Sequence, residues 1–123
     1  MSQWTHVCGC IRVDAFRIGE NDFERFQIES ALGRIVRYGD DDYETILPCG
    51  SEGSLEYEIY ENPDKTCIAA YVVAIWGDLR DYSDVEEIEE WFNVACSTIT
   101  FVRNAVLHID VEGGLEKTIT YKT

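Results

Sequence analysis

The fold is decided by one stretch in the middle of the chain, residues 54–76, which reads SLEYEIYENPDKTCIAAYVVAIW. Its first eight residues alternate between apolar and charged side chains, with Leu55 and Ile59 on the apolar side, which predicts a strand with one buried face. Residues 62–65 have the composition of a turn, and residues 67–76 form a long apolar run. We therefore expect a β-hairpin whose second strand lies in the interior of a sheet.

The residues before this hairpin predict a strand and then a helix. Residues 4–14 alternate with a period of two, which is typical of a strand. Asn21 and Asp22 offer an N-cap, and Phe26, Ile28, Leu32 and Ile35 follow at roughly helical spacing. Residues 24–30 also fit a strand, so this helix has an alternative.

The residues after the hairpin predict a second helix and two more strands. Ser83-Asp84-Val85-Glu86 matches a capping box with Ser83 as the N-cap, and the helix over residues 84–96 places Val85, Ile88, Phe92 and Ala95 on one face. Residues 101–111 and 115–122 alternate as strands joined through Gly113-Gly114, with Leu115, Ile119 and Tyr121 expected to point inward.

Together these patterns predict an α+β fold with the order β-α-β-β-α-β-β. We expect one domain over residues 1–123, with an antiparallel sheet of about five strands and two helices on one face, similar to a ferredoxin-like sheet with an extra C-terminal strand. The alternative is a mostly antiparallel β protein with one helix. Trp76-Gly77-Asp78-Leu79-Arg80-Asp81-Tyr82 is expected to connect the hairpin to the second helix, with Arg80 as a local ion-pair anchor.

The composition excludes some classes of function but does not identify one. The 123 residues include 10 Lys and Arg against 24 Asp and Glu, a net charge of −14, and 46% hydrophobic residues supply a core. A polyanion repels nucleic acid and anionic membranes, so neither is expected as a direct partner. The sequence shows no secretory signal or membrane-spanning run, and five cysteines are an odd number, so we expect a cytoplasmic protein with reduced, mostly buried thiols.

The carboxylates are concentrated in two stretches without Lys or Arg. Nine lie between Arg37 and Lys65 and six between Arg80 and Arg103, which makes fifteen of the 24 acids. A solubilising surface is the simpler interpretation, and a basic protein partner is the functional one, because rows of carboxylates can occupy a groove built for phosphates. The candidate partner-binding residues are Asp40, Asp41, Asp42, Glu44, Asp84, Glu86, Glu87, Glu89 and Glu90.

Other constellations in the sequence favour structural roles. His6, Cys8 and Cys10 share one face of a strand, but alternate strand positions lie about 6.6 Å apart, too far for three ligands to converge on one zinc ion. The glycine-rich loop over residues 48–54 lies among carboxylates, which disfavours both an anion site and a reactive cysteine. His108 and Asp110 share a strand face without a nucleophile. No catalytic residue, metal or cofactor is therefore predicted.

Three segments resemble small acidic proteins encoded by bacteriophages. They are Trp4-Thr5-His6-Val7, Gly50-Ser51-Glu52-Gly53-Ser54-Leu55-Glu56-Tyr57 through Glu61-Asn62-Pro63, and Gly77-Asp78-Leu79-Arg80-Asp81-Tyr82. Phage proteins of this size and acidity are similar in type to anti-CRISPR and other anti-defence inhibitors, several of which imitate nucleic acid. The resemblance implies a class of protein and assigns no residue a role.

The leading expectation is a non-enzymatic inhibitor in the host cytoplasm. Its acidic surface would block the nucleic-acid-binding groove of a basic host defence protein, such as a CRISPR effector. Two alternatives remain open: a module that binds a small molecule such as a nucleotide signal near Trp4, Trp76 or Trp91, and a homo-oligomeric structural protein that pairs through a sheet edge.

Overall fold

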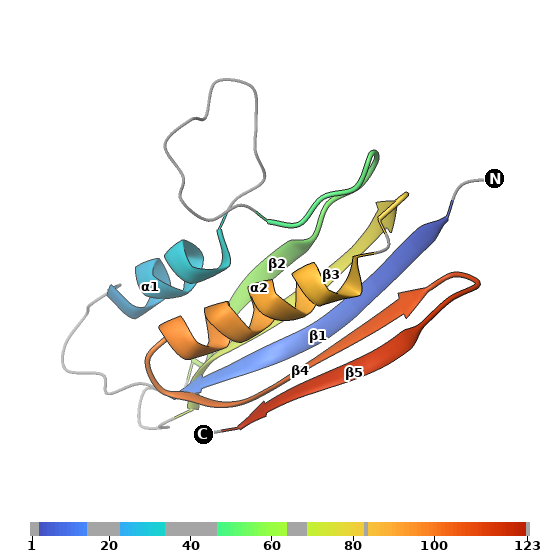
Figure 1. Ribbon diagram of the computed structural model, residues 1–123. Helices are drawn as coiled ribbons and strands as arrows, with labels where there is room; N and C mark the ends of the chain where they lie inside the picture. The colour runs from blue at the N-terminus through green and yellow to red at the C-terminus, as the bar shows by residue number, and fades with distance from the viewer. Residues whose placement is uncertain (1–2, 15–22, 34–46, 64–68, 83, 123) are drawn as a thin grey trace.

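A computed structural model describes residues 3–14, 23–33, 47–63, 69–82 and 84–122. Five strands form one antiparallel sheet in the order β2-β3-β1-β4-β5, accompanied by two helices (Figure 1). The elements are β1 (Trp4–Asp14), α1 (Phe23–Leu32), β2 (Glu56–Glu61), β3 (Ala69–Arg80), α2 (Val85–Thr98), β4 (Val102–Val111) and β5 (Glu116–Lys122). The predicted α+β class and antiparallel sheet are confirmed, and the alternative with a single helix is wrong.

Strand β1 is the centre of the sheet and pairs along nearly its whole length with both β3 and β4. Cys8, for example, lies opposite Trp76 on one side and His108 on the other. The backbones pack closely at Gly9, where a Cβ atom would lie 2.9 Å from the Cα of Leu107 and collide with the carbonyl oxygen of Val106. Glycine is therefore required at the middle of this strand.

Strand β3 extends further than the sequence predicts. It continues through Gly77 to Arg80, over residues expected to form a connector, because Leu79 and Arg80 pair with the first residues of β1. Position 77 requires glycine, because a Cβ atom there would lie only 2.7 Å from the carbonyl oxygen of Ser54. The expected ion-pair role of Arg80 is confirmed by its contact with Glu52, at 2.6 Å between Nη1 and Oε1.

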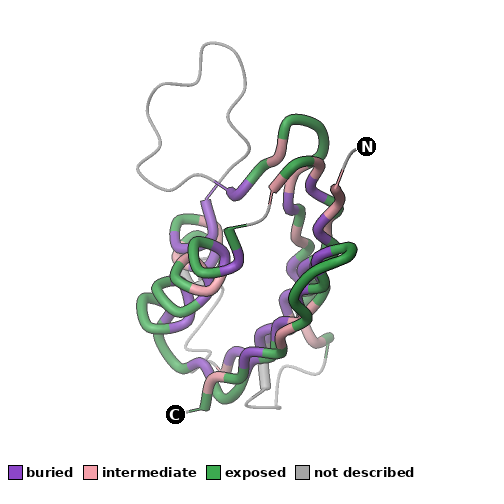
Figure 2. The backbone as a smooth tube through the Cα atoms, turned by 45° about the vertical axis from the view of Figure 1, so that its right-hand side comes forward, coloured by how far each residue is buried: buried purple, intermediate pink, exposed green. Residues whose placement is uncertain are grey.

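Both helices cover the same face of the sheet, and the hydrophobic core lies between these two layers (Figure 2). The four α2 residues predicted to face inward are all buried. Ile28 and Leu32 of α1 are fully buried beside them, whereas Phe26 is 67% exposed and does not belong to the apolar face predicted for it. Indole Nε1 of Trp91 on α2 donates to the carbonyl oxygen of Leu32 at 3.0 Å, which joins the two helices.

The helix ends differ in detail from the predictions. The N-cap of α2 is Asp84 rather than Ser83, because an oxygen of the Asp84 side chain accepts the backbone N–H of Glu87 at 3.1 Å. Helix α1 ends at Leu32, since Gly33 adopts a φ of 90° and its N–H donates to the carbonyl of Glu29. Ile35, expected on the same helix, lies outside the described residues.

Strand β5 begins after the Gly113-Gly114 turn, as expected, and buries Ile119. Leu115 was expected to point inward with it, but Leu115 lies in the turn, before the first paired residue, and is 58% exposed. No helix in the described part of the chain is long and apolar enough to cross a membrane.

Candidate functional site

The solvent-facing side of α2 carries most of the described carboxylates that the sequence singles out. Because Val85, Ile88 and Phe92 face the sheet, Glu86, Glu87 and Glu90 are left exposed to water on the other side of the helix. We refer to Glu86, Glu87 and Glu90 as the α2 acidic row. The ion pairs formed among the described residues involve none of these three carboxylates.

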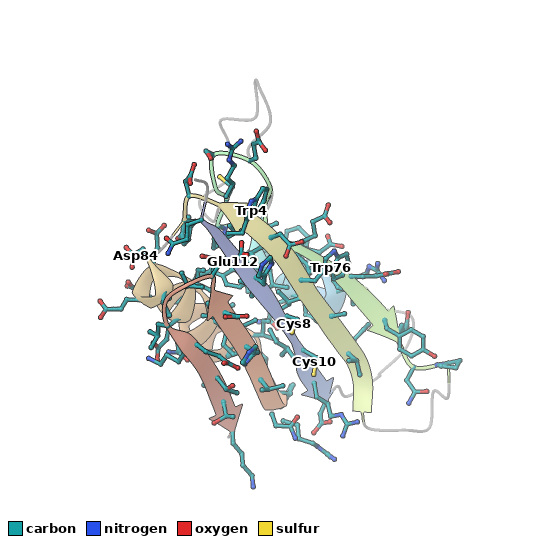
Figure 3. The ribbon with its side chains drawn as sticks, turned by 90° about the vertical axis from the view of Figure 1, so that its right-hand side faces the viewer. Trp4, Cys8, Cys10, Trp76, Asp84 and Glu112 are labelled. Atoms are coloured by element: carbon teal, nitrogen blue, oxygen red, sulfur yellow. The ribbon has the colours of Figure 1, made fainter. Side chains whose placement is uncertain are left out.

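The remaining α2 candidates are engaged in structure. Asp84 caps the helix, and Figure 3 shows it at the end of α2. Glu89 is half-buried, and its Oε2 contacts Nζ of Lys117 on β5 at 2.5 Å. This pair ties α2 to the edge strand and neutralises one carboxylate of the helix. Asp40, Asp41, Asp42 and Glu44, the other group of candidates, lie outside the described residues.

Most of the described cations are held by carboxylates of the protein itself. The described segments contain six Lys and Arg residues, and four of them (Arg25, Arg80, Arg103 and Lys117) form ion pairs. Arg103 Nε, for instance, lies 2.8 Å from Oδ2 of Asp14. Among the described residues, these four cations pair with carboxylates other than Glu86, Glu87 and Glu90.

Carboxylates near α2 also influence Tyr82, which precedes the helix. Burial raises the pKa of the Tyr82 phenol well above its usual value, and the neighbouring Glu87 and Asp84 carboxylates add to the shift. The phenol therefore stays neutral. Since the hydroxyl of Thr5 donates to the carbonyl oxygen of Tyr82, the start of α2 is fastened to β1.

The face of the sheet opposite the helices is uncovered among the described residues, and Figure 3 looks onto it. We call it the uncovered face. One row of residues crosses the five strands as Glu56, Trp76, Cys8, His108 and Thr118, and the next as Glu58, Ala74, Cys10, Val106 and Thr120. Sequence reasoning recognised the outward residues of single strands but not that register aligns them into one surface.

One end of the uncovered face carries a histidine between carboxylates. Nδ1 of His6 lies 2.5 Å from Oδ1 of Asp78, and Nε2 lies 3.7 Å from Oε1 of Glu112. The hydrogen bond to Asp78 is the main cause that raises the pKa of His6 above 6.5. At a given pH, His6 is therefore protonated to a greater extent than a free histidine. Its partners are carboxylates only, with no nucleophile among them.

His108 does not pair with Asp110, as an Asp–His catalytic pair would require. Its Nδ1 lies 2.8 Å from the hydroxyl oxygen of Thr118, and its Nε2 lies 3.1 Å from Oε1 of Glu116 on β5. Both ring nitrogens are thus engaged across the strand pair, which gives His108 a structural environment.

The described thiols are less buried than predicted. Cys8 and Cys10 are exposed and partly exposed, because β1 presents both on the uncovered face. Cys49 is also exposed, and of the described cysteines only Cys96 is buried. Burial raises the pKa of the Cys96 thiol to about 12. Within the segments that the structure describes, no group of three or more His, Cys, Asp and Glu side chains could hold a metal ion.

Comparisons of the chain with protein-family models, with curated proteins and with solved structures give no match.

Proposed function

We propose that this protein is a non-enzymatic inhibitor whose acidic surface occupies the nucleic-acid-binding groove of a basic protein. The observation that carries the proposal is the α2 acidic row, three solvent-facing carboxylates on one helix that pair with no described cation. The bacteriophage-like character of the sequence favours a host defence protein in the cytoplasm, such as a CRISPR effector, as the partner.

The spacing of charge on α2 supports mimicry of a nucleic acid. From Asp84 to Glu90 the helix rises about 9 Å and carries five carboxylates, of which Lys117 neutralises one. Duplex DNA carries one charge per about 1.7 Å, or about five over the same length. A groove lined with Lys and Arg to bind phosphates would therefore meet a similar charge density on α2.

We also propose a ferredoxin-like arrangement with an added C-terminal strand as the scaffold of this surface. It is supported by the element order β-α-β-β-α-β before β5, and by the position of β1 between β3 and β4 in the antiparallel sheet. In this arrangement α2 is backed by the sheet, so its solvent-facing side is presented as a rigid ridge.

The test is capture of a partner from a lysate of cells that carry defence systems, with the tagged protein as bait. The decisive variant reverses the α2 acidic row to lysine. A charge-matched control reverses Glu29, Glu52 and Glu112, three exposed or half-exposed carboxylates outside α2. Both variants change the net charge by six units.

We expect the wild-type bait to retain a basic nucleic-acid-binding protein at low salt, the control to retain most of it, and the α2 variant to lose it. Equal loss in both variants would show that total charge, rather than this helix, causes the binding. Retention by the α2 variant would contradict the proposal.

A further inference from the structure

The uncovered face has an apolar centre. Trp76 on β3 is 40% exposed and Val106 on β4 is 37% exposed, and both lie near the middle of the five-stranded sheet. Cys8 on β1 lies between these strands, directly opposite Trp76 (Figure 3). Large apolar side chains exposed together at the centre of a sheet are typical of an interaction surface.

The Trp76 ring is held in place by a carboxylate. Its indole Nε1 donates to Oε2 of Glu56 on β2 at 3.1 Å. This hydrogen bond limits rotation of the ring, so little side-chain entropy would be lost when a partner contacts it. The Trp76 ring is thus a preorganised aromatic anchor beside the Glu56 carboxylate.

The surroundings of this anchor are acidic. The outward positions of the strands carry five carboxylates (Glu56, Glu58, Asp78, Asp110 and Glu116) against three Lys and Arg residues (Arg12, Arg80 and Lys122). Arg80 pairs with Glu52 at the end of β3, and Arg12 and Lys122 lie in the row furthest from Asp78. Trp76 therefore lies in the acidic part of the face, two residues from Asp78 along β3 and opposite Glu56.

We propose that the uncovered face binds an arginine-containing segment of a basic protein, with Trp76 stacking on a guanidinium group. A guanidinium stacks on the face of an indole and also forms paired hydrogen bonds with a carboxylate, whereas a lysine ammonium is a compact and more strongly hydrated charge. Glu58, in the row beside Trp76, offers such a carboxylate, whereas Asp78, in the row on the other side, already binds Nδ1 of His6 through its Oδ1.

Charge selects this occupant over two others. A nucleic-acid strand whose bases stacked on Trp76 would bring its phosphates against the carboxylates of the face. A second copy of the chain would bring its own carboxylates against the same ones. Because β2 has only six residues and β5 seven, the part of the face where all five strands lie side by side measures about 19 Å across the strands and about 20 Å along them. This part suits a short segment better than a standard domain interface of about 800 Å² per partner.

This surface lies on the side of the sheet opposite α2, so it does not depend on the role proposed for the α2 acidic row. The two proposals therefore concern separate surfaces of the molecule. Each can be tested while the other is left intact.

The test uses octa-arginine and octa-lysine peptides as probes on the full chain, with Cys8 as a local reporter. Cys8 lies on the uncovered face, whereas Cys49 is exposed in the loop before β2 and serves as a control in the same molecule. The rate of alkylation of each thiol by a neutral reagent is followed by peptide mass spectrometry, with and without peptide, at low salt.

We expect octa-arginine to slow alkylation of Cys8 more than that of Cys49, and to do so at about five-fold lower concentration than octa-lysine. Trp76→Leu keeps an apolar side chain but removes the indole, and should abolish the preference for arginine. Glu58→Lys, a second and independent variant, should weaken protection by both peptides. Reversal of the α2 acidic row should leave the preference for arginine unchanged.

Equal protection of Cys8 and Cys49, equal potency of the two peptides, or an arginine preference that survives Trp76→Leu would overturn this inference. Failure of the α2 variant to affect partner capture would count only against the function proposed for α2. The two hypotheses therefore fail separately.

Discussion

Replacement of Phe92 by alanine tests whether α2 is oriented as described. Phe92 is fully buried between α2 and the sheet, and it is the largest fully buried side chain in the described part of the chain. Deleting a buried phenylalanine side chain costs about 3–5 kcal/mol, through lost transfer free energy and the cavity left behind. A domain of this size is stable by about 5–15 kcal/mol, so the variant should fold but with much of its stability lost.

The matched control is Val94→Ala, two residues further along the same helix, where the side chain is 54% exposed. We expect this change to alter the free energy of unfolding by no more than about 0.5 kcal/mol. Urea denaturation followed by circular dichroism gives both values. Comparable losses in the two variants would mean that the helix is rotated from the described orientation, and the α2 acidic row would then not face solvent.

Three further results are expected from the fold and its titratable groups. Gly9→Ala should destabilise the protein by about 3 kcal/mol or more in urea denaturation, because the new Cβ atom collides with the β4 backbone; a loss below 1 kcal/mol would refute the close approach. Nuclear magnetic resonance titration should give His6 a pKa above 6.5, and this pKa should fall in the Asp78→Asn variant. Since the pKa is raised on folding, the His6–Asp78 pair stabilises the protein below pH 6.5, and this contribution disappears as the pH rises through the folded-state pKa. An unchanged pKa in the variant would exclude the pair. Cys8 should be alkylated in the folded protein, whereas Cys96, with a pKa raised to about 12, should react only after urea unfolding; equal rates would contradict its burial.

Strict periodicity explains why parts of the fold could be predicted from the sequence. Strand β1 has the predicted bounds, since residues 4–14 alternate without interruption, and the inward face of α2 follows from its helical spacing. Local composition misled elsewhere. Gly77 and Asp78 are uncommon in strands and indicate a connector, but pairing with β1 carries β3 through both of them. Tertiary pairing overrides local propensity at this point.

The candidate site was predicted in part for a similar reason. Exposure of Glu86, Glu87 and Glu90 follows from the helical period of α2. Neutralisation of Glu89 by Lys117, in contrast, depends on a contact between two residues that are 28 positions apart in the sequence. The uncovered face depends on register among five strands, which no single stretch of sequence specifies. Faces of single elements can thus be read from sequence, but surfaces built from several elements cannot.

Competition with nucleic acid shows whether this protein occupies the nucleic-acid-binding groove of its partner. The basic protein captured by the bait is incubated with a fluorescent duplex that it binds, and displacement of the duplex by this protein is followed by anisotropy at two salt concentrations. We predict displacement that weakens at high salt and disappears when the α2 acidic row is reversed to lysine, while the charge-matched control still displaces the duplex. Simultaneous binding of the duplex and this protein, or displacement unaffected by the α2 reversal, would mean that the α2 acidic row does not occupy the groove.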